Sequence, residues 1–117
     1  MLYDAKGFEK IYIKPGYTDL RKGIDGLKLV IGRDMNLNPF EKDVLFLFCG
    51  RDSSKIRGLV WEGDGFLLLV KRVEDGRYVW PRNAEEVRAL TQEQFERLMS
   101  GFSIESTIKG MTPQKIF

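Results

Sequence analysis

The stretch from Val44 to Pro81 alternates between apolar runs and short turn sequences, and it predicts the centre of the fold. Four apolar runs are separated by three turn segments, at 50–54, 62–65 and 74–77. Aspartate followed by glycine, which occurs in the second and third segments, is typical of tight hairpins, because a type I′ turn requires positive φ at both central positions. The pattern therefore predicts an antiparallel meander of four strands.

Loop centres at Gly63-Asp64 and Asp75-Gly76 fix the register of this meander. The expected cross-strand pairs are Lys55 with Arg72, Arg57 with Val70, Leu59 with Leu68, Trp61 with Phe66, Val73 with Tyr78, and Lys71 with Trp80. Because side chains alternate between the two sides of a sheet, this register also decides which residues share a face.

The two faces of the meander differ in character. One face is apolar and carries Ile56, Val60, Leu67, Leu69, Val73, Tyr78 and Trp80. The other carries Leu59, Trp61, Phe66, Leu68 and Val70, and it ends in Lys55, Arg57 and Arg72. The run Val44–Cys49 has no polar residue, which is typical of a central strand covered on both sides. We therefore expect helices on one face, partial cover on the other, and an exposed basic end.

A short strand and a first helix precede the meander. Lys10–Lys14 alternates as a strand does, and Pro15-Gly16 should end it. Thr18 is the expected N-cap of the helix, whose apolar stripe is Leu20, Ile24, Leu27 and Ile31. Gly23 and Gly26 lie inside this helix, where each glycine costs about 1 kcal/mol relative to alanine. They are interpreted either as letting the helix lie close to the sheet or as admitting the backbone of a partner.

A second helix follows the meander. Thr91 and Gln94 form a capping-box pattern, and Gly101 should end the helix. The residues expected to face the core are Phe95, Leu98 and Met99, with Phe102 and Ile104 docking behind them. Residues 84–90 fit either a helical turn or an edge segment. Residues 1–106 are thus predicted to form a single α+β domain, a mostly antiparallel sheet of four to five strands with an N-terminal and a C-terminal helix packed on it, followed by a mobile tail at 107–117.

Composition narrows the class of protein more than it identifies one. The chain has 117 residues, 43% hydrophobic and 31% charged, with a net charge of +2, so the total charge gives no argument for nucleic-acid binding. It has no histidine and a single cysteine, which removes the commonest general base and any Cys-rich metal site. We expect no cofactor and no membrane span. The start of the chain lacks the apolar core of a signal peptide, and a cytoplasmic location is expected.

Several segments together carry a resemblance to a known family. They are IYIKPGYTDLRKGIDGL (Ile11–Leu27), NPF (Asn38–Phe40), the whole of Val44–Pro81, and LTQEQFERLMSGF (Leu90–Phe102). In combination they resemble the small accessory protein, TnpB or the second-frame product, of bacterial insertion sequences of the IS66 family. The resemblance implies a protein encoded beside a larger DDE-type transposase and associated with transposition.

The first hypothesis for function is DNA binding at the insertion-sequence ends. Six basic residues are the candidates for nucleic-acid contact: Arg21, Lys22, Arg51, Lys55, Arg57 and Arg72. Exposed Trp61 or Phe66 would stack on unpaired bases, unless a helix buries them. Members of the family usually have a more basic turn after the first strand of the meander, and Asp52 is a departure that lowers the charge there.

Two other hypotheses remain at this point. One is a protein-interaction module that docks on the transposase without contacting DNA, which the low net charge and the apolar second face favour. The other is a small enzyme in which carboxylates bind Mg²⁺. The candidate carboxylates are Asp19, Asp25, Asp64 and Asp75, but each has a simpler place in a helix or a turn. The sequence therefore favours a non-enzymatic accessory protein, with DNA contact slightly preferred over protein contact.

Overall fold

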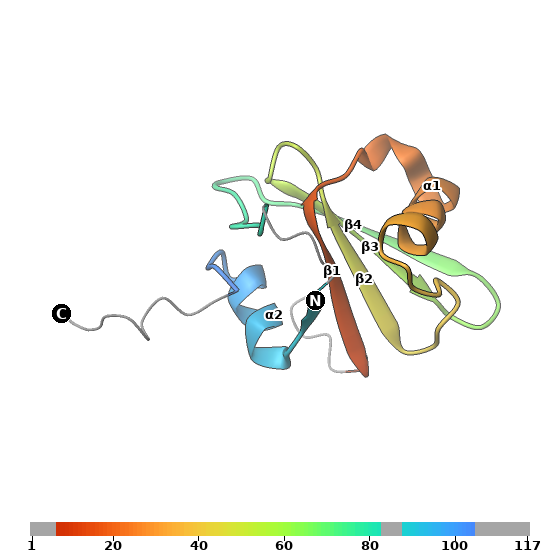
Figure 1. Ribbon diagram of the computed structural model, residues 1–117. Coiled ribbons are helices and arrows are strands. Elements are labelled where there is room, and N and C mark those ends of the chain that lie inside the picture. The colour runs from red at the N-terminus through yellow and green to blue at the C-terminus, as the bar shows by residue number, and fades with distance from the viewer. Residues whose placement is uncertain (1–6, 83–87, 105–117) are drawn as a thin grey trace.

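The computed structural model describes residues 7–82 and 88–104, and it has three layers, with one helix on each side of a five-stranded sheet (Figure 1). The strand order is β4-β3-β2-β1-β5. The elements are β1 (Lys10–Tyr17), α1 (Gly23–Leu29), β2 (Val44–Cys49), β3 (Lys55–Trp61), β4 (Phe66–Arg72), β5 (Arg88–Leu90) and α2 (Gln92–Met99). The α+β class and the mostly antiparallel sheet are confirmed.

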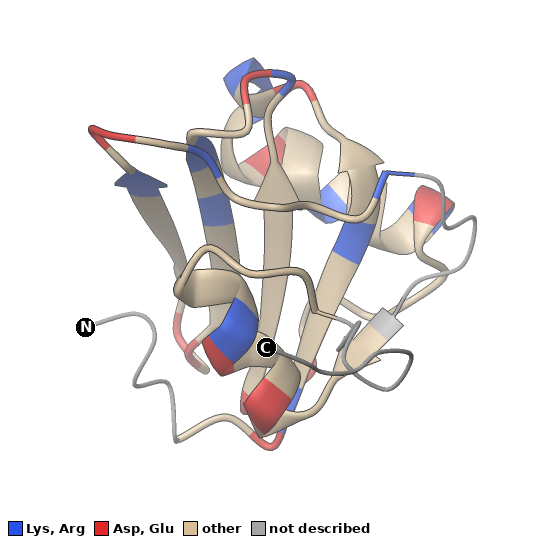
Figure 2. Ribbon diagram, turned by 90° about the vertical axis from the view of Figure 1, so that its left-hand side faces the viewer, with Lys and Arg blue, Asp and Glu red and all other residues tan. Residues whose placement is uncertain are grey.

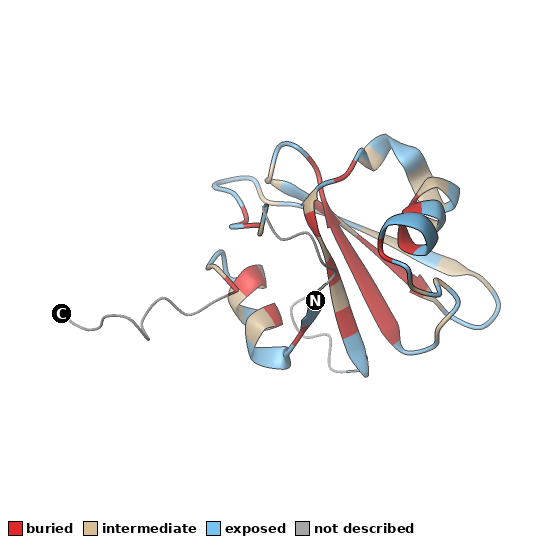
Figure 3. Ribbon diagram, viewed as in Figure 1, coloured by how far each residue is buried: buried red, intermediate tan, exposed pale blue. Residues whose placement is uncertain are grey.

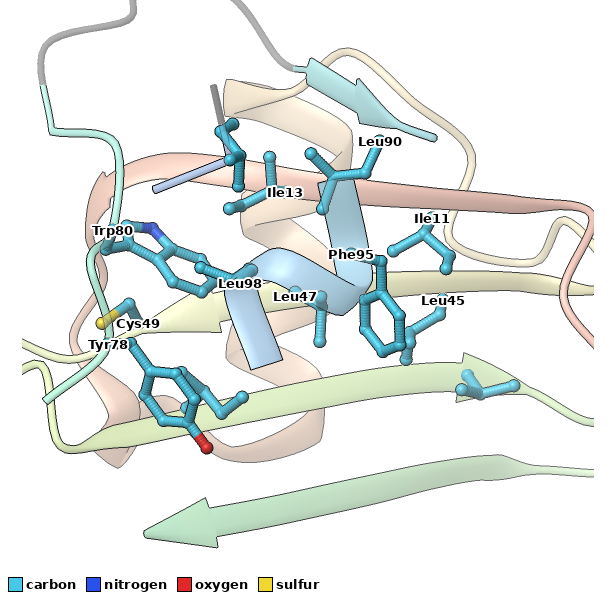
Figure 4. Close-up of a cluster of buried hydrophobic side chains, with 13 residues drawn as sticks. Ile11, Ile13, Leu45, Leu47, Cys49, Tyr78, Trp80, Leu90, Phe95 and Leu98 are labelled. Atoms are coloured by element: carbon cyan, nitrogen blue, oxygen red, sulfur yellow. The ribbon is translucent and has the colours of Figure 1, made fainter. Parts of the chain in front are cut away.

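Strand β2 is the centre of the molecule. All six of its residues are buried (Figure 3), which confirms the prediction of a strand covered on both faces. The expectation of helices on one face is wrong, because α1 and α2 lie on opposite sides of the sheet (Figure 1). The cluster under α1 includes Leu27, Ile31, Phe46 and Leu59. The cluster under α2 includes Leu45, Leu47, Phe95 and Leu98 (Figure 4). A strand with no polar residue needs both covers.

The β3–β4 hairpin has the register expected from the sequence. Lys55 lies opposite Arg72, Leu59 opposite Leu68, and Trp61 opposite Phe66. The turn is closed by a hydrogen bond of 2.8 Å from the backbone N–H of Glu62 to the carbonyl of Gly65. Among its central residues only Gly63 has positive φ, which is the pattern of a type II′ turn and not of the expected type I′ turn.

The fourth strand of the meander does not form. After β4, residues 73–82 cross the end of the sheet toward β1, where the backbone N–H of Gly16 bonds to the carbonyl of Pro81 at 2.8 Å. The indole N–H of Trp80 donates to the carbonyl of Lys14 at 2.9 Å. Tyr78 and Trp80 are buried on the face where they were expected, beside α2 (Figure 4). The alternation in the sequence therefore indicates that these two side chains are buried, but their backbone does not pair with β4 as a strand.

Strand β1 is longer than expected and parallel to β2. It continues through Pro15 and Gly16 to Tyr17, with a shift of register between Ile13 and Tyr17. Gly16 has φ of 77°, and this conformation lets the strand bend instead of ending. The two strands are parallel, and the connection through α1 is long enough for the crossover that a parallel pair requires. The edge segment at 84–90, left open by the sequence, contains β5, which pairs antiparallel with β1.

The first helical segment begins one residue later than predicted, with a 3₁₀ turn at Leu20–Lys22. Asp19, and not Thr18, caps this turn, because its carboxylate accepts a hydrogen bond from the backbone N–H of Arg21. The turn leads into α1, whose own N-cap, Lys22, makes no side-chain cap bond, and a π-helical turn at Val30–Asp34 extends the helix. Thr18 is buried instead.

The structure gives each of the two helix glycines a local role. Gly23 has φ of 72°, and a Cβ on it would meet nothing within 4 Å, so it serves the change of direction between the 3₁₀ turn and α1 and does not let the helix lie closer to the sheet. A Cβ on Gly26 would overlap the Cβ of Lys22 in the preceding turn. The approach of a partner backbone stays a prediction.

The second helix follows the sequence prediction closely. Thr91 and Gln94 form a complete capping box, Phe95 and Leu98 are fully buried, and Gly101 has φ of 89° after the helix. Ile104 docks on the core, but Phe102 is 58% exposed, so the prediction for that residue is wrong. No helix within the described residues is long and apolar enough to span a membrane. The proposed tail at 107–117 lies outside the described residues.

Candidate nucleic-acid interface

A shallow hollow of about 580 Å³ lies at the end of the sheet where β1 and β2 finish and β3 begins. Its walls come from the end of β1, the 3₁₀ turn before α1, the β2–β3 turn and the first residues of β3. The charged and aromatic residues that line it are Tyr17, Asp19, Arg21, Arg51, Asp52, Lys55 and Arg57. We call this region the basic hollow.

The two acidic side chains of the basic hollow are both paired with arginine. Asp19 binds the guanidinium of Arg21 through two hydrogen bonds, of 3.0 and 3.1 Å. The hydrogen bonds from the Arg21 side chain and backbone lower the pKa of Asp19 to about 2. Asp52 accepts from Arg77 at 2.9 Å, and the Ser54 backbone N–H is the main cause that lowers the pKa of Asp52. Both carboxylates are therefore ionised, and the negative charge of each is paired with an arginine.

Three basic side chains of the hollow form no ion pair with a described carboxylate. Within the described part of the chain, no carboxylate forms a salt bridge with Arg51, Lys55 or Arg57. Lys55 and Arg57 share one face of β3 because they are two residues apart. Figure 2 shows where Lys and Arg lie along the strands and turns of the sheet. The hollow is therefore a positive patch although the whole protein carries only +2.

Tyr17 is the aromatic residue of the hollow, and the sequence analysis did not identify it. Its ring is 52% exposed. The guanidinium of Arg51 lies 4.7 Å from the ring centroid and donates to the Tyr17 hydroxyl at 2.9 Å. Arg82 lies over the same ring at 5.7 Å. The sequence signal was the position of Tyr17 between a strand and a helix cap; in the structure it is the last residue of β1. The approach of Arg82 depends on residues 73–82, which we call the crossing segment.

The structure brings together four of the six predicted contact residues. Arg21, Arg51, Lys55 and Arg57 all line the basic hollow. The other two do not. Lys22 is exposed beside the hollow, and Arg72 donates to Glu74 at 2.9 Å at the edge of the sheet.

The two aromatic residues proposed for base stacking lie elsewhere. Trp61 and Phe66 pack against each other and against Phe40, with ring centroids 4.9 to 5.1 Å apart. Lys28 of α1 lies over this group, 5.1 Å from the Phe66 centroid. The cluster is at the opposite end of β3 from Lys55, so these rings do not contribute to the hollow.

The carboxylates considered for a metal site are scattered. Asp19 is paired in the hollow, Asp25 pairs with Lys28 at 3.6 Å, and Asp64 and Asp75 occupy separate turns. In residues 7–82 and 88–104, no group of three or more His, Cys, Asp or Glu side chains is arranged to hold a metal ion.

The fold and the hollow define a small α+β protein with an open basic surface site. The model of the family described as IS66 Orf2 like protein matches residues 9–109, and this chain belongs to that family. The protein is therefore associated with transposition of bacterial insertion sequences, as an accessory protein of the IS66 family.

Two relatives come from Sinorhizobium fredii (strain NBRC 101917 / NGR234), and both are named as uncharacterized proteins. The protein y4hO is 32% identical over 107 residues, which cover 92% of each chain. The protein y4jC is 26% identical over 101 residues, which cover 86% of this chain and 85% of the relative. No solved structure matches the chain.

Proposed function

We propose that this protein is a non-enzymatic accessory factor that contacts the DNA of the transposable element through the basic hollow. The observation that carries the proposal is a set of three cations gathered around one open hollow, Arg51, Lys55 and Arg57, none of which forms a salt bridge with a described carboxylate. Lysine and arginine at such a surface bind phosphate oxygens, which fix a protein on DNA without reading its sequence.

Tyr17 adds a second kind of contact to this surface. Its half-exposed ring is held by Arg51, so its orientation is fixed before DNA arrives. An aromatic face of this kind stacks on a base or a sugar where the strand is locally unpaired, and stacking is worth about 1–3 kcal/mol per base. The hollow would therefore favour distorted or single-stranded DNA over a regular duplex. Transposition takes place on cellular DNA, which agrees with the cytoplasmic location expected from the sequence.

The salt dependence of binding tests the phosphate contacts. If three cations each neutralise one phosphate, the logarithm of the association constant should fall with the logarithm of salt concentration with a slope of about −3. The measurement is fluorescence anisotropy of a labelled insertion-sequence end, titrated at several salt concentrations, with a scrambled duplex and the corresponding single strand as comparisons. Stronger binding to the end than to the scrambled duplex would indicate sequence reading as well.

A matched pair of variants locates the contact. Lys55→Glu changes the hollow, while Lys42→Glu makes the same change in net charge before the start of β2, at the other end of that strand. Lys55→Glu should weaken binding and reduce the salt slope by about 1, and Lys42→Glu should leave both nearly unchanged. The double variant Lys55→Glu/Arg57→Glu should abolish binding. Equal effects of the two single variants would refute a contact at the hollow.

Docking on the transposase is the second candidate function, and the ion pairs Asp19–Arg21 and Asp52–Arg77 favour it, because they reduce the field of the hollow. This alternative predicts co-purification with the transposase after nuclease treatment. If no DNA binds at low salt while that complex persists, the protein is an interaction module and not a DNA-binding factor.

A further inference from the structure

The outer edge of β4 is unpaired in the described chain. Strand β4 is the last strand of the sheet, and no strand of residues 7–82 or 88–104 pairs with its far side. Its first five residues, Phe66 to Val70, are all apolar. The ladder with β3 runs without a register shift. Edge strands usually carry a charge, a proline or a bulge that prevents pairing with another chain. Phe66–Val70 carries none of them, and the charged residues of β4, Lys71 and Arg72, are confined to its end.

The hydrogen bonds of the β3–β4 hairpin show which backbone groups face outward. Glu62 bonds to Gly65 at one end of the hairpin, and Val73 bonds to Ser54 at the other, at 2.8 and 2.9 Å. Hydrogen-bonded pairs alternate with non-bonded pairs along an antiparallel ladder. The backbone groups of Leu67, Leu69 and Lys71 are therefore used within the hairpin. The backbone N–H and C=O groups that point away from β3 are those of Phe66, Leu68, Val70 and Arg72.

The outward groups of β4 match those of a second copy of the same strand. An antiparallel pairing about a two-fold axis at Leu68 places Leu68 opposite Leu68 of the second copy and Val70 opposite Phe66. On the other face Leu69 lies opposite Leu67. Each outward backbone group in this register meets an outward group, so a complete ladder forms.

Charge and ladder length together favour this register over its neighbours. With the axis at Leu68, the Arg72 guanidinium, which is bonded to Glu74 in the single chain, comes near the exposed Asp64 carboxylate in the turn of the second copy. Moving the axis to Leu69 would place Glu74 opposite Asp64, and moving it to Val70 would place Phe66 opposite Glu74. An axis at Leu67 would place Arg72 opposite Glu62, but Val70 would then face the turn and the ladder would be shorter. Opposite charges across a strand pair stabilise it, and like charges oppose it.

We propose that two copies of this chain associate through β4, in the register centred on Leu68, to form one continuous ten-stranded sheet. Pairing would also cover Val70, which is 62% exposed, and Leu67, which is 39% exposed. An axis perpendicular to the sheet keeps both basic hollows on the same side of the dimer. The ends marked by Lys55 and Arg72 lie four residues from the axis, so the two ends are about 27 Å apart along the strands.

Sedimentation equilibrium of the full-length protein without DNA tests the dimer, over a range from low to several hundred micromolar. We expect a reversible monomer–dimer equilibrium. Val70→Pro removes one outward N–H and no bond to β3, and it should abolish the dimer. The matched control Val70→Thr keeps the N–H and the branched shape, and it should dimerise nearly as the native protein does. Circular dichroism of each variant reports whether the sheet is intact.

Exchange of the charged pair tests the register without touching the core. Arg72→Asp and Asp64→Arg should each raise the dimer dissociation constant about tenfold, because two opposite-charge pairs become like-charge pairs. The double variant Asp64→Arg/Arg72→Asp should restore the native value. A protein that stays monomeric throughout, a dimer that Val70→Pro leaves unchanged, or a double variant no tighter than the single ones would each overturn the proposal. The test contains no DNA, so its outcome is independent of the proposed DNA contact.

Discussion

Replacing Trp80 with phenylalanine tests the crossing segment, residues 73–82, which stands where the sequence predicts a fourth strand. Trp80 is only 5% exposed, and its indole N–H is the donor to the carbonyl of Lys14 at 2.9 Å. Phenylalanine keeps an aromatic ring in the core but removes the donor and part of the buried surface. The change therefore removes the side-chain hydrogen bond from this segment to β1.

The magnitude follows from two losses. The Lys14 carbonyl is left in a partly buried position without the indole donor, which costs about 1–3 kcal/mol. The missing part of the ring removes packing and leaves a small cavity, worth roughly 2 kcal/mol by comparison with other reductions of core side chains. The free energy of unfolding should therefore fall by about 3–5 kcal/mol, a large part of the ~5–15 kcal/mol that stabilises a typical domain.

Urea unfolding followed by far-UV circular dichroism measures this loss. The native protein, Trp80→Phe and Val79→Ala should be compared, because Val79 lies in the same segment and is 49% exposed. The Val79 variant should change stability by less than about 0.5 kcal/mol. If Trp80→Phe costs no more than the Val79 variant, Trp80 does not anchor the crossing segment and the assignment of this segment is wrong.

Three further predictions concern local features. Gly26→Ala should destabilise the protein by about 1 kcal/mol or more, because its Cβ would overlap the Cβ of Lys22. This loss is expected although alanine is the better helix former. In a thermal unfolding assay, adding Lys22→Gly to the same chain should reverse the loss. Thr91→Ala removes the capping box of α2 and should cost about 1 kcal/mol, whereas Thr91→Ser should be nearly neutral; equal midpoints for both variants would exclude the cap. Burial raises the pKa of the Cys49 thiol to about 11. The folded protein should therefore react slowly with a thiol reagent near pH 8.5 and rapidly in urea, and its stability should fall as pH rises from about 8.5, the ordinary thiol pKa, toward 11. Fast labelling of the folded protein would contradict the buried position.

The register of the β3–β4 hairpin could be predicted because local signals agree there. A turn with glycine joins two strands whose apolar residues alternate, and a shift by one residue would move every side chain to the wrong face. The parallel pairing of β1 with β2 could not be predicted in the same way. It depends on contacts between segments more than 30 residues apart. A strand sequence without polar residues indicates that both faces are buried, but it does not indicate which segments bury them.

The failure of the fourth strand has a physical explanation. Tyr78 and Trp80 alternate with exposed residues as in a strand, and both are buried. The same alternation arises when an irregular segment lies across a sheet and inserts every second side chain. Only the partners of the backbone distinguish the two cases, and here they are Ser53 and Gly16, not β4.

The candidate site was predictable where it lies on a strand. Lys55 and Arg57 were placed together by alternation alone, and both line the basic hollow. Tyr17 and Arg82 were not identified, because their contact requires the chain to return across the sheet after β4. The sequence therefore predicts the side of the hollow formed by β3, whereas the contact of Tyr17 with Arg82 depends on the long-range path of the chain.

The role of Asp52 changes once its partners are known. In the sequence it is the residue that makes the β2–β3 turn less basic than is usual in the family, and it weakens the argument for DNA contact. In the structure its carboxylate accepts from the Ser54 backbone N–H, which shapes the turn, and from Arg77 of the crossing segment. Its charge is thus neutralised from outside the hollow, and Arg51 on the adjacent position is free of it and turns to Tyr17. Arg77→Ala should therefore weaken DNA binding although Arg77 lines no part of the hollow, because it leaves the Asp52 carboxylate uncompensated beside the three cations. Asp52→Asn in the same chain should restore the affinity, and an anisotropy titration that shows no restoration would refute this electrostatic account.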